Sequence, residues 1–96
     1  MNKTIKIKVV DGKVRVTPNS CKARHHYQIE WQSNLRFIVY FGYLSPLDKK
    51  IFSNNQPGGI VKYDATYSGP KKFKYLVGVI YNNKILMKDP ELDIQP

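Results

Sequence analysis

The strand-turn-strand pattern of residues 73–94 constrains the fold of this chain more than any other feature. Up to Asn82-Asn83, every second side chain is apolar, which is the period of a β-strand and not of a helix. Asparagine tolerates positive φ, so this pair predicts a two-residue turn that places Tyr81 opposite Lys84. Both faces of the hairpin carry apolar side chains, which predicts a central position in the protein.

A second hairpin is predicted near the start of the chain. Asp11-Gly12 is a strong hairpin signal, and a two-residue turn there places Lys8 opposite Arg15. One face of this hairpin is aliphatic and is expected to cover one side of a core. The other face is basic, and its opposed like charges need water around them. The cations of that face are Lys6, Lys8, Lys13 and Arg15.

The only tryptophan, Trp31, ends the next alternating segment, residues 27–31. It is expected to be the largest side chain of the core and to pack there with Tyr75 and Val77. Further strands are expected at residues 35–41, 60–67 and 92–94.

Residues 42–59 lose this alternation and contain several Pro, Gly and Asn residues, which predicts one long surface loop. A short helical turn at residues 47–51 is an alternative within it. The loop holds more apolar side chains than a tether needs, so it is expected to pack across an end of the fold and to bind a protein partner. The candidate binding residues are Tyr43, Leu44, Leu47, Ile51 and Phe52.

Seven or eight short strands, separated by turns and without a convincing helix, argue for an all-β fold. We expect an antiparallel β-sandwich, with a small barrel as the alternative. Residues 1–96 are long enough for one domain with its own core and no stabilising metal. The single cysteine, Cys21, can form no internal disulfide.

The chain is strongly basic, with 16 Lys and Arg against 7 Asp and Glu and a net charge of +9. Nucleic acid or another polyanion is therefore the alternative to a protein partner. Its candidate binding residues are Lys6, Lys8, Lys13 and Arg15 of the first hairpin, with Lys71, Lys72 and Lys74. Residues 1–10 contain no continuous apolar run, so we expect no secretory signal, no membrane partner and a cytoplasmic location.

Four segments carry a resemblance to a known family. They are Gly12-Lys13-Val14 with Val16 and Pro18, then Ile29-Glu30-Trp31, then Phe73-Lys74-Tyr75-Leu76-Val77, then Lys88-Asp89-Pro90. Their order resembles that of small bacterial cupredoxin-like proteins of unassigned function. The resemblance implies a cupredoxin-like sandwich, with an immunoglobulin-like one as the alternative, and implies little about activity. The chain departs from the pattern between Pro18 and Tyr27, where Arg24-His25-His26 replaces a Gly-Asp turn.

A cupredoxin-like fold raises the question of copper. A blue-copper site needs two His and one Cys, usually with an axial Met. Cys21, His25 and His26 lie early in the chain, and no Cys or His follows them, although Met87 offers a thioether. We therefore expect no metal and no cofactor, a buried thiol and a polar histidine turn, and we keep a copper electron-transfer protein as a remote alternative.

Catalytic residues are not expected either. Cys21 and His25 are close in sequence without a geometry that would make a nucleophile and its base. There are no paired carboxylates in an expected cleft, and Pro57-Gly58-Gly59 lacks the lysine and helix of a phosphate-binding loop. The sequence thus predicts a non-enzymatic binding module.

Overall fold

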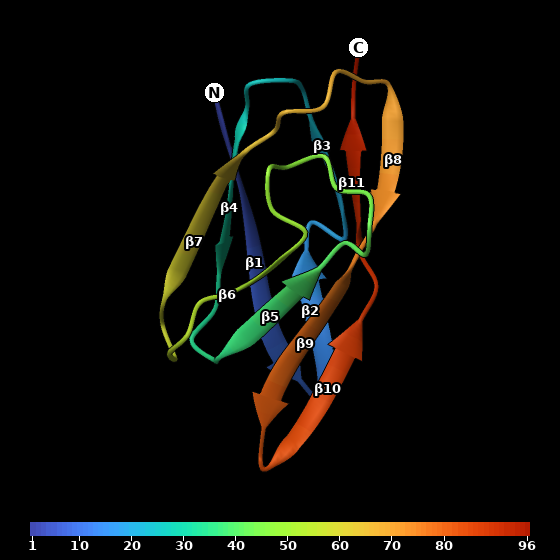
Figure 1. Cartoon of the computed structure of the whole chain (residues 1–96). Coiled ribbons are helices and arrows are strands. Elements are labelled where there is room, and N and C mark those ends of the chain that lie inside the picture. Colours follow the sequence, from blue (N-terminus) through green and yellow to red (C-terminus); the bar gives the residue numbers. More distant parts are fainter.

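Eleven β-strands and no helix make up the computed structural model, which describes residues 1–96 (Figure 1). The strands are β1 (Asn2–Val10), β2 (Lys13–Thr17), β3 (Ser20–Ala23), β4 (Gln28–Gln32), β5 (Phe37–Tyr40), β6 (Ile51–Ser53), β7 (Ile60–Asp64), β8 (Lys71–Lys74), β9 (Leu76–Tyr81), β10 (Lys84–Lys88) and β11 (Glu91–Ile94). They form three sheets with the orders β2-β1-β4-β7, β10-β9-β5-β6 and β3-β11-β8. The all-β prediction is confirmed.

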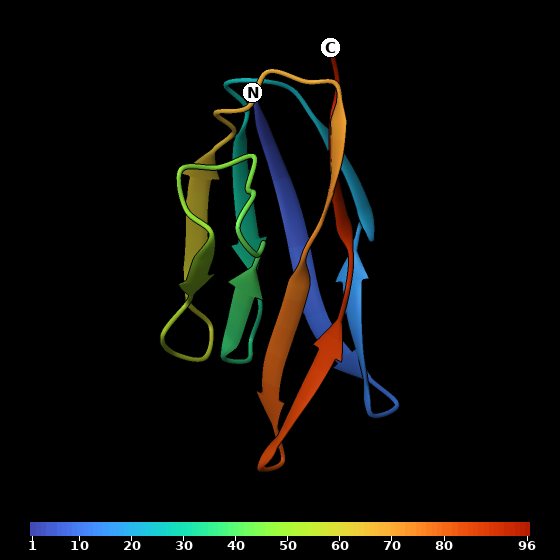
Figure 2. The ribbon, with the colours of Figure 1, turned by 45° about the vertical axis from the view of Figure 1, so that its right-hand side comes forward.

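The second and third sheets are joined by the chain itself. β8 continues into β9, and β11 follows β10, as the orange and red ribbon of Figure 2 shows. Tyr75 lies between the first two strands, and Asp89-Pro90 lies between the other two. The two sheets therefore form one bent layer, which packs with the first sheet around a single core. The core holds alternate side chains of all three sheets, including Ile5, Trp31, Val79 and Leu92.

Both predicted hairpin registers are confirmed. Lys8 pairs with Arg15 in β1–β2, and Tyr81 pairs with Lys84 in β9–β10. Each turn uses two consecutive residues with positive φ, 52° and 76° at Asp11-Gly12, 49° and 61° at Asn82-Asn83. This backbone twist matches that of the flanking strands, so residue chemistry at the turn is enough to set the register.

Trp31 lies in the core as predicted, with no exposed surface. Its indole Nε1 donates a hydrogen bond to Tyr75 Oη at 3.3 Å, and its ring meets the Tyr75 and Phe52 rings edge-on. Burial raises the pKa of the Tyr75 hydroxyl above its ordinary value, although the hydrogen bond from Trp31 acts in the opposite direction. The phenol oxygen thus satisfies the one polar group of the indole inside the core.

The strand pairing differs from the prediction in two ways. Two of the three sheets are mixed, because β1 pairs with β4 and β3 pairs with β11 in parallel. The strands also exceed the predicted seven or eight, since β6 and β3, which follows Pro18, were not predicted, and the expected strand 73–81 is divided into β8 and β9 at Tyr75. Proline cannot donate to a strand ladder, so it divides a long extended run. One strand is shorter than predicted, since β7 ends at Asp64 and not at residue 67.

The prediction of one long loop at residues 42–59 is wrong, because this segment contains β6, which pairs with β5. The alternative, a helical turn at residues 47–51, does not form either. The buried side chain of Asn54 fixes the end of this segment. Its Oδ1 accepts from the Phe37 N–H at 2.9 Å, and its Nδ2 donates to the carbonyls of Leu35 at 2.9 Å and Gly59 at 3.3 Å. These bonds join the segment to β5 and extend the sheet to four strands.

Candidate functional site

The outer face of the sheet β10-β9-β5-β6 is apolar and exposed. Alternation along β5 and β9 places one set of side chains in the core and the other set on this face, whereas on β10 Ile85 and Met87 alternate with the half-buried Leu86 and the exposed Lys84 and Lys88. The exposed set, which we call the apolar face, consists of Ile38, Tyr40, Ile51, Leu76, Ile80, Ile85 and Met87. Their exposed fractions run from 42% to 66%, so they form a surface and not the margin of the core.

The strand registers make the apolar face continuous. Ile80 pairs with Ile85 on the β10 side of β9. Tyr40 pairs with Leu76 of β9 on one side and with Ile51 of β6 on the other. The face therefore crosses all four strands without interruption.

Gly78 lies at the middle of this face. A β-carbon at this position would lie 3.0 Å from Cγ2 of Ile38 and 3.7 Å from Cγ2 of Ile85. The glycine thus lets two isoleucines from the neighbouring strands cover the β9 backbone, and Gly78 itself is buried. The result is a closely packed apolar surface and not a cavity.

The hairpin of residues 73–94 was expected to lie centrally because both of its faces are apolar. That prediction is wrong for β10, which is an edge strand. Val77 and Val79 on the inner face of β9 are fully buried, whereas Ile80 and Ile85 on the outer face are 49% and 66% exposed. The second apolar face of the hairpin has no cover within the chain.

The predicted binding residues of segment 42–59 divide between the core and the surface. Leu47 and Phe52 are 5% and 8% exposed and belong to the core. This corrects the predicted loop surface, since these two side chains offer almost no area to a partner. Tyr43 and Leu44 are exposed, and Ile51 is part of the apolar face.

The predicted cations also divide into two groups. Lys6 and Lys8 of β1 and Lys13 and Arg15 of β2 share the outer face of the first sheet, which we call the basic face. None of these four pairs with a carboxylate, since the one ion pair of the chain joins Lys62 Nζ to Glu30 at 3.6 Å. Lys71, Lys72 and Lys74 lie on β8, in the other layer, and do not extend the basic face.

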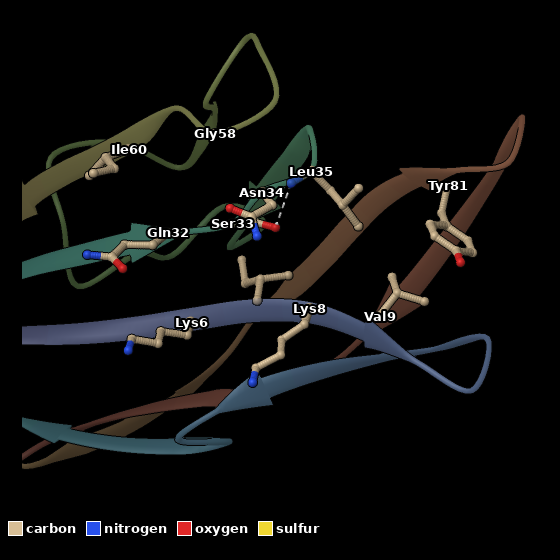
Figure 3. Close-up of a pocket in the computed structure, with 11 residues that line it drawn as sticks. Lys6, Lys8, Val9, Gln32, Ser33, Asn34, Leu35, Gly58, Ile60 and Tyr81 are labelled. Carbon is tan, nitrogen blue, oxygen red and sulfur yellow. Dashed lines mark hydrogen bonds between the residues drawn. The ribbon is translucent and has the colours of Figure 1, made fainter.

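A groove of about 620 Å³ opens beside β1 (Figure 3). β4 pairs with β1 only as far as Lys6 with Gln32, after which the chain turns away at Ser33. In Figure 3, Val9 and Tyr81 lie at one end of the groove, and Ser33 Oγ accepts a hydrogen bond from the Leu35 N–H at 3.1 Å. The lining contains no His, Cys, Asp or Glu that could act as a base or hold a metal.

The cysteine and histidines do not form a common site. Cys21 is buried in β3, and this burial raises the pKa of its thiol, although Lys3 acts in the opposite direction. The rings of His25 and His26 are exposed and stack at 3.7 Å between centroids, and Met87 lies on the apolar face. No group of three or more His, Cys, Asp or Glu side chains gathers in residues 1–96. Because the chain has no helix, it has no helical segment that could span a bilayer.

No protein-family model matches this chain, and no functionally characterised protein matches it either. The site therefore rests on the geometry of the residues described above.

Six members of the apolar face were not predicted as site residues. These are Ile38, Tyr40, Leu76, Ile80, Ile85 and Met87. The signal for them was present in the sequence, since both sets of alternating positions are apolar in residues 37–41 and 76–80. A pattern of this kind shows that two faces require cover but does not show which of them the chain covers.

Proposed function

We propose that this chain is a non-enzymatic protein-binding module, built on a β-sandwich of cupredoxin-like or immunoglobulin-like type, and that its protein partner docks on the apolar face. The observation that supports this is the continuous set of seven exposed apolar side chains across four strands. A contiguous apolar patch on a small protein marks an interaction site more often than single exposed apolar residues do.

The energetic gain from covering this face is of the right size for a reversible complex. Full burial of one such side chain stabilises by about 1.5–3 kcal/mol. Since these seven are about half exposed, covering them supplies roughly 5–10 kcal/mol, against an association cost of about 4–15 kcal/mol. The surplus from this face alone is at most about 6 kcal/mol, and the apolar area that the partner buries adds to it, so micromolar rather than nanomolar affinity is expected.

Capture of the partner tests the proposal. The wild-type chain, Ile80→Lys and Ile60→Lys would each be used to capture proteins from cells that produce this chain, and the captured proteins would be identified by mass spectrometry. Ile80 and Ile60 are 49% and 54% exposed, but Ile60 lies on β7 of the opposite layer, so it is a matched control. A partner should be retained by Ile60→Lys and lost with Ile80→Lys. Equal capture by both variants would contradict the proposal.

A polyanion is a second candidate ligand, supported by the four cations of the basic face that have no carboxylate partner. If the basic face binds nucleic acid, affinity should fall steeply as salt is added, because fewer counterions are released. Lys8→Glu combined with Arg15→Glu should then weaken binding, and Ile80→Lys should not. Oligonucleotide titrations at two salt concentrations separate the two candidates.

A further inference from the structure

We propose that the partner on the apolar face is a second copy of this chain, and that two copies pack through the outer faces of their β10-β9-β5-β6 sheets. This inference rests on the proposed function of that face and names its occupant. Two related copies present the same patch to each other, which requires the patch to be self-complementary. An apolar sheet face can meet this requirement, since two such faces pack against each other as the layers of a sandwich do.

The distribution of charge favours this occupant over an acidic protein or an anionic membrane. The seven side chains of the apolar face include no charged group. Arg36 and Lys74 border the face near opposite ends of β9, next to Ile80 and Leu76, and the exposed Lys84 and Lys88 flank its members on the edge strand β10. The larger cluster, the basic face, lies on the outer side of the other layer and not among these apolar side chains. The surface that covers these seven side chains is therefore expected to be apolar, and this chain carries such a surface itself.

The net charge of +9 does not prevent this association. Packed sheets lie about 10 Å apart, so the four layers of a pair of copies would place their two basic faces roughly 30 Å from each other. The Debye length at physiological ionic strength is about 8 Å, so repulsion across this distance is largely screened. The sheet β3-β11-β8, which belongs to the same layer as the apolar face, carries both positive and negative side chains, since Asp93 of β11 pairs with Lys22 of β3 and with Lys72 of β8.

The centre of the face fits a sheet-on-sheet contact. Ile38 and Ile85 each place a methyl group beside the position that a side chain of Gly78 would occupy, so apolar groups fill the space above the glycine. The most exposed members, Ile85 and Met87, are both 66% exposed and lie on the edge strand β10, where a second copy covers them most easily.

Sedimentation equilibrium tests the inference, with the wild-type chain, Ile80→Lys and Ile60→Lys measured from about 1 µM to about 1 mM. The wild-type chain and Ile60→Lys should show the same monomer–dimer equilibrium, and Ile80→Lys should weaken it at least about tenfold, because a charge is then buried without a partner. Added salt should leave dimerisation unchanged or strengthen it, since only repulsion is screened. Trp31 fluorescence and circular dichroism of each variant would establish that it is folded.

Three results would overturn the inference. They are a wild-type chain that stays monomeric throughout, an Ile80→Lys variant that dimerises like the wild type, and an Ile60→Lys variant that is weakened equally. If the chain is monomeric but a different captured protein is lost only with Ile80→Lys, the proposed function stands and the occupant is wrong. If anionic phosphatidylglycerol vesicles bind the wild-type chain and not Ile80→Lys, the face is a lipid surface and both proposals fail.

Discussion

The outward side chains are charged on β8 and apolar on β9, although the two strands follow each other directly along the chain. On β8 the outward side chains are Lys72 and Lys74, and on β9 they are Leu76 and Ile80, with the same alternation throughout. The neighbouring strands change in the same way, since β11 presents Glu91 and Asp93, whereas β10 presents Ile85 and Met87. The change occurs at Tyr75 on one strand and at Asp89-Pro90 on the other.

This comparison separates what folding requires from what binding requires. The β8–β11 half shows that charged side chains are compatible with the outer face of this layer, because Glu91 pairs with Lys74 and Asp93 with Lys72 across the strands. The inner face is apolar in both halves, with Phe73 and Leu92 buried in one and Val77 and Val79 in the other. The core therefore does not explain the apolar outer face of the β9–β10 half, whereas the partner that we propose would explain it.

The largest expected effect concerns the core that both halves share. Trp31→Ala should lower the free energy of unfolding by about 3–5 kcal/mol, because it leaves a cavity and removes the hydrogen bond to Tyr75. Urea unfolding followed by circular dichroism measures this, with Trp31→Phe as the milder control. If the two halves unfolded separately, or if Trp31→Ala cost less than about 1 kcal/mol, the assumption of one common core would be wrong.

A smaller effect is expected at high pH from Tyr75, which sits at the junction of the two halves. Its raised pKa means that the unfolded chain loses the phenolic proton first, so stability is fully present below about pH 10 and declines as pH rises above it. Tyr75→Phe should cost about 1 kcal/mol at neutral pH, through the lost hydrogen bond to Trp31, and should reduce the decline above pH 10.

Thermal unfolding between pH 7 and 11 measures this dependence. Tyr43→Phe is the matched control, because Tyr43 is 88% exposed. An unchanged pH profile in Tyr75→Phe would show that the Tyr75 hydroxyl does not contribute to it.

The smallest expected effect on stability comes from making the apolar half resemble the charged half. Leu76→Lys combined with Met87→Glu continues the alternation of Lys74 and Glu91 across the bend. The variant should fold with a free energy of unfolding within about 1 kcal/mol of the wild type, since both positions are exposed, and should lose association. Cooperative urea unfolding and sedimentation measure the two properties. Loss of folding would mean that the apolar face supports the fold and not a partner.

The parts of the fold that were predictable are those set by neighbouring residues. Asp11-Gly12 and Asn82-Asn83 determine the turn backbone locally, and the register of each hairpin follows from its turn. Trp31 was recognisable as a core residue from the alternation that ends at it.

The remaining features depend on partners far away in sequence. The parallel pairs β1–β4 and β3–β11 have no local turn signal. β6 lies in a segment without alternation, beside the bonds from Asn54 to Leu35 and Phe37, which are 17 to 19 residues away. The candidate site was missed for a related reason, because two apolar faces on one hairpin do not reveal which face the rest of the chain covers.

The most direct test of a covered apolar face is the solvent accessibility of isoleucine methyl groups, measured by NMR with a soluble paramagnetic agent at increasing protein concentration. Ile38, Ile51, Ile80 and Ile85 report on the apolar face, and Ile60, which is 54% exposed on the opposite layer, is the internal control. Paramagnetic relaxation should fall for the four methyl groups of the face as copies associate and should stay constant for Ile60. Relaxation that remains constant at all five positions up to about 1 mM, where a complex of micromolar affinity is saturated, would contradict this expectation.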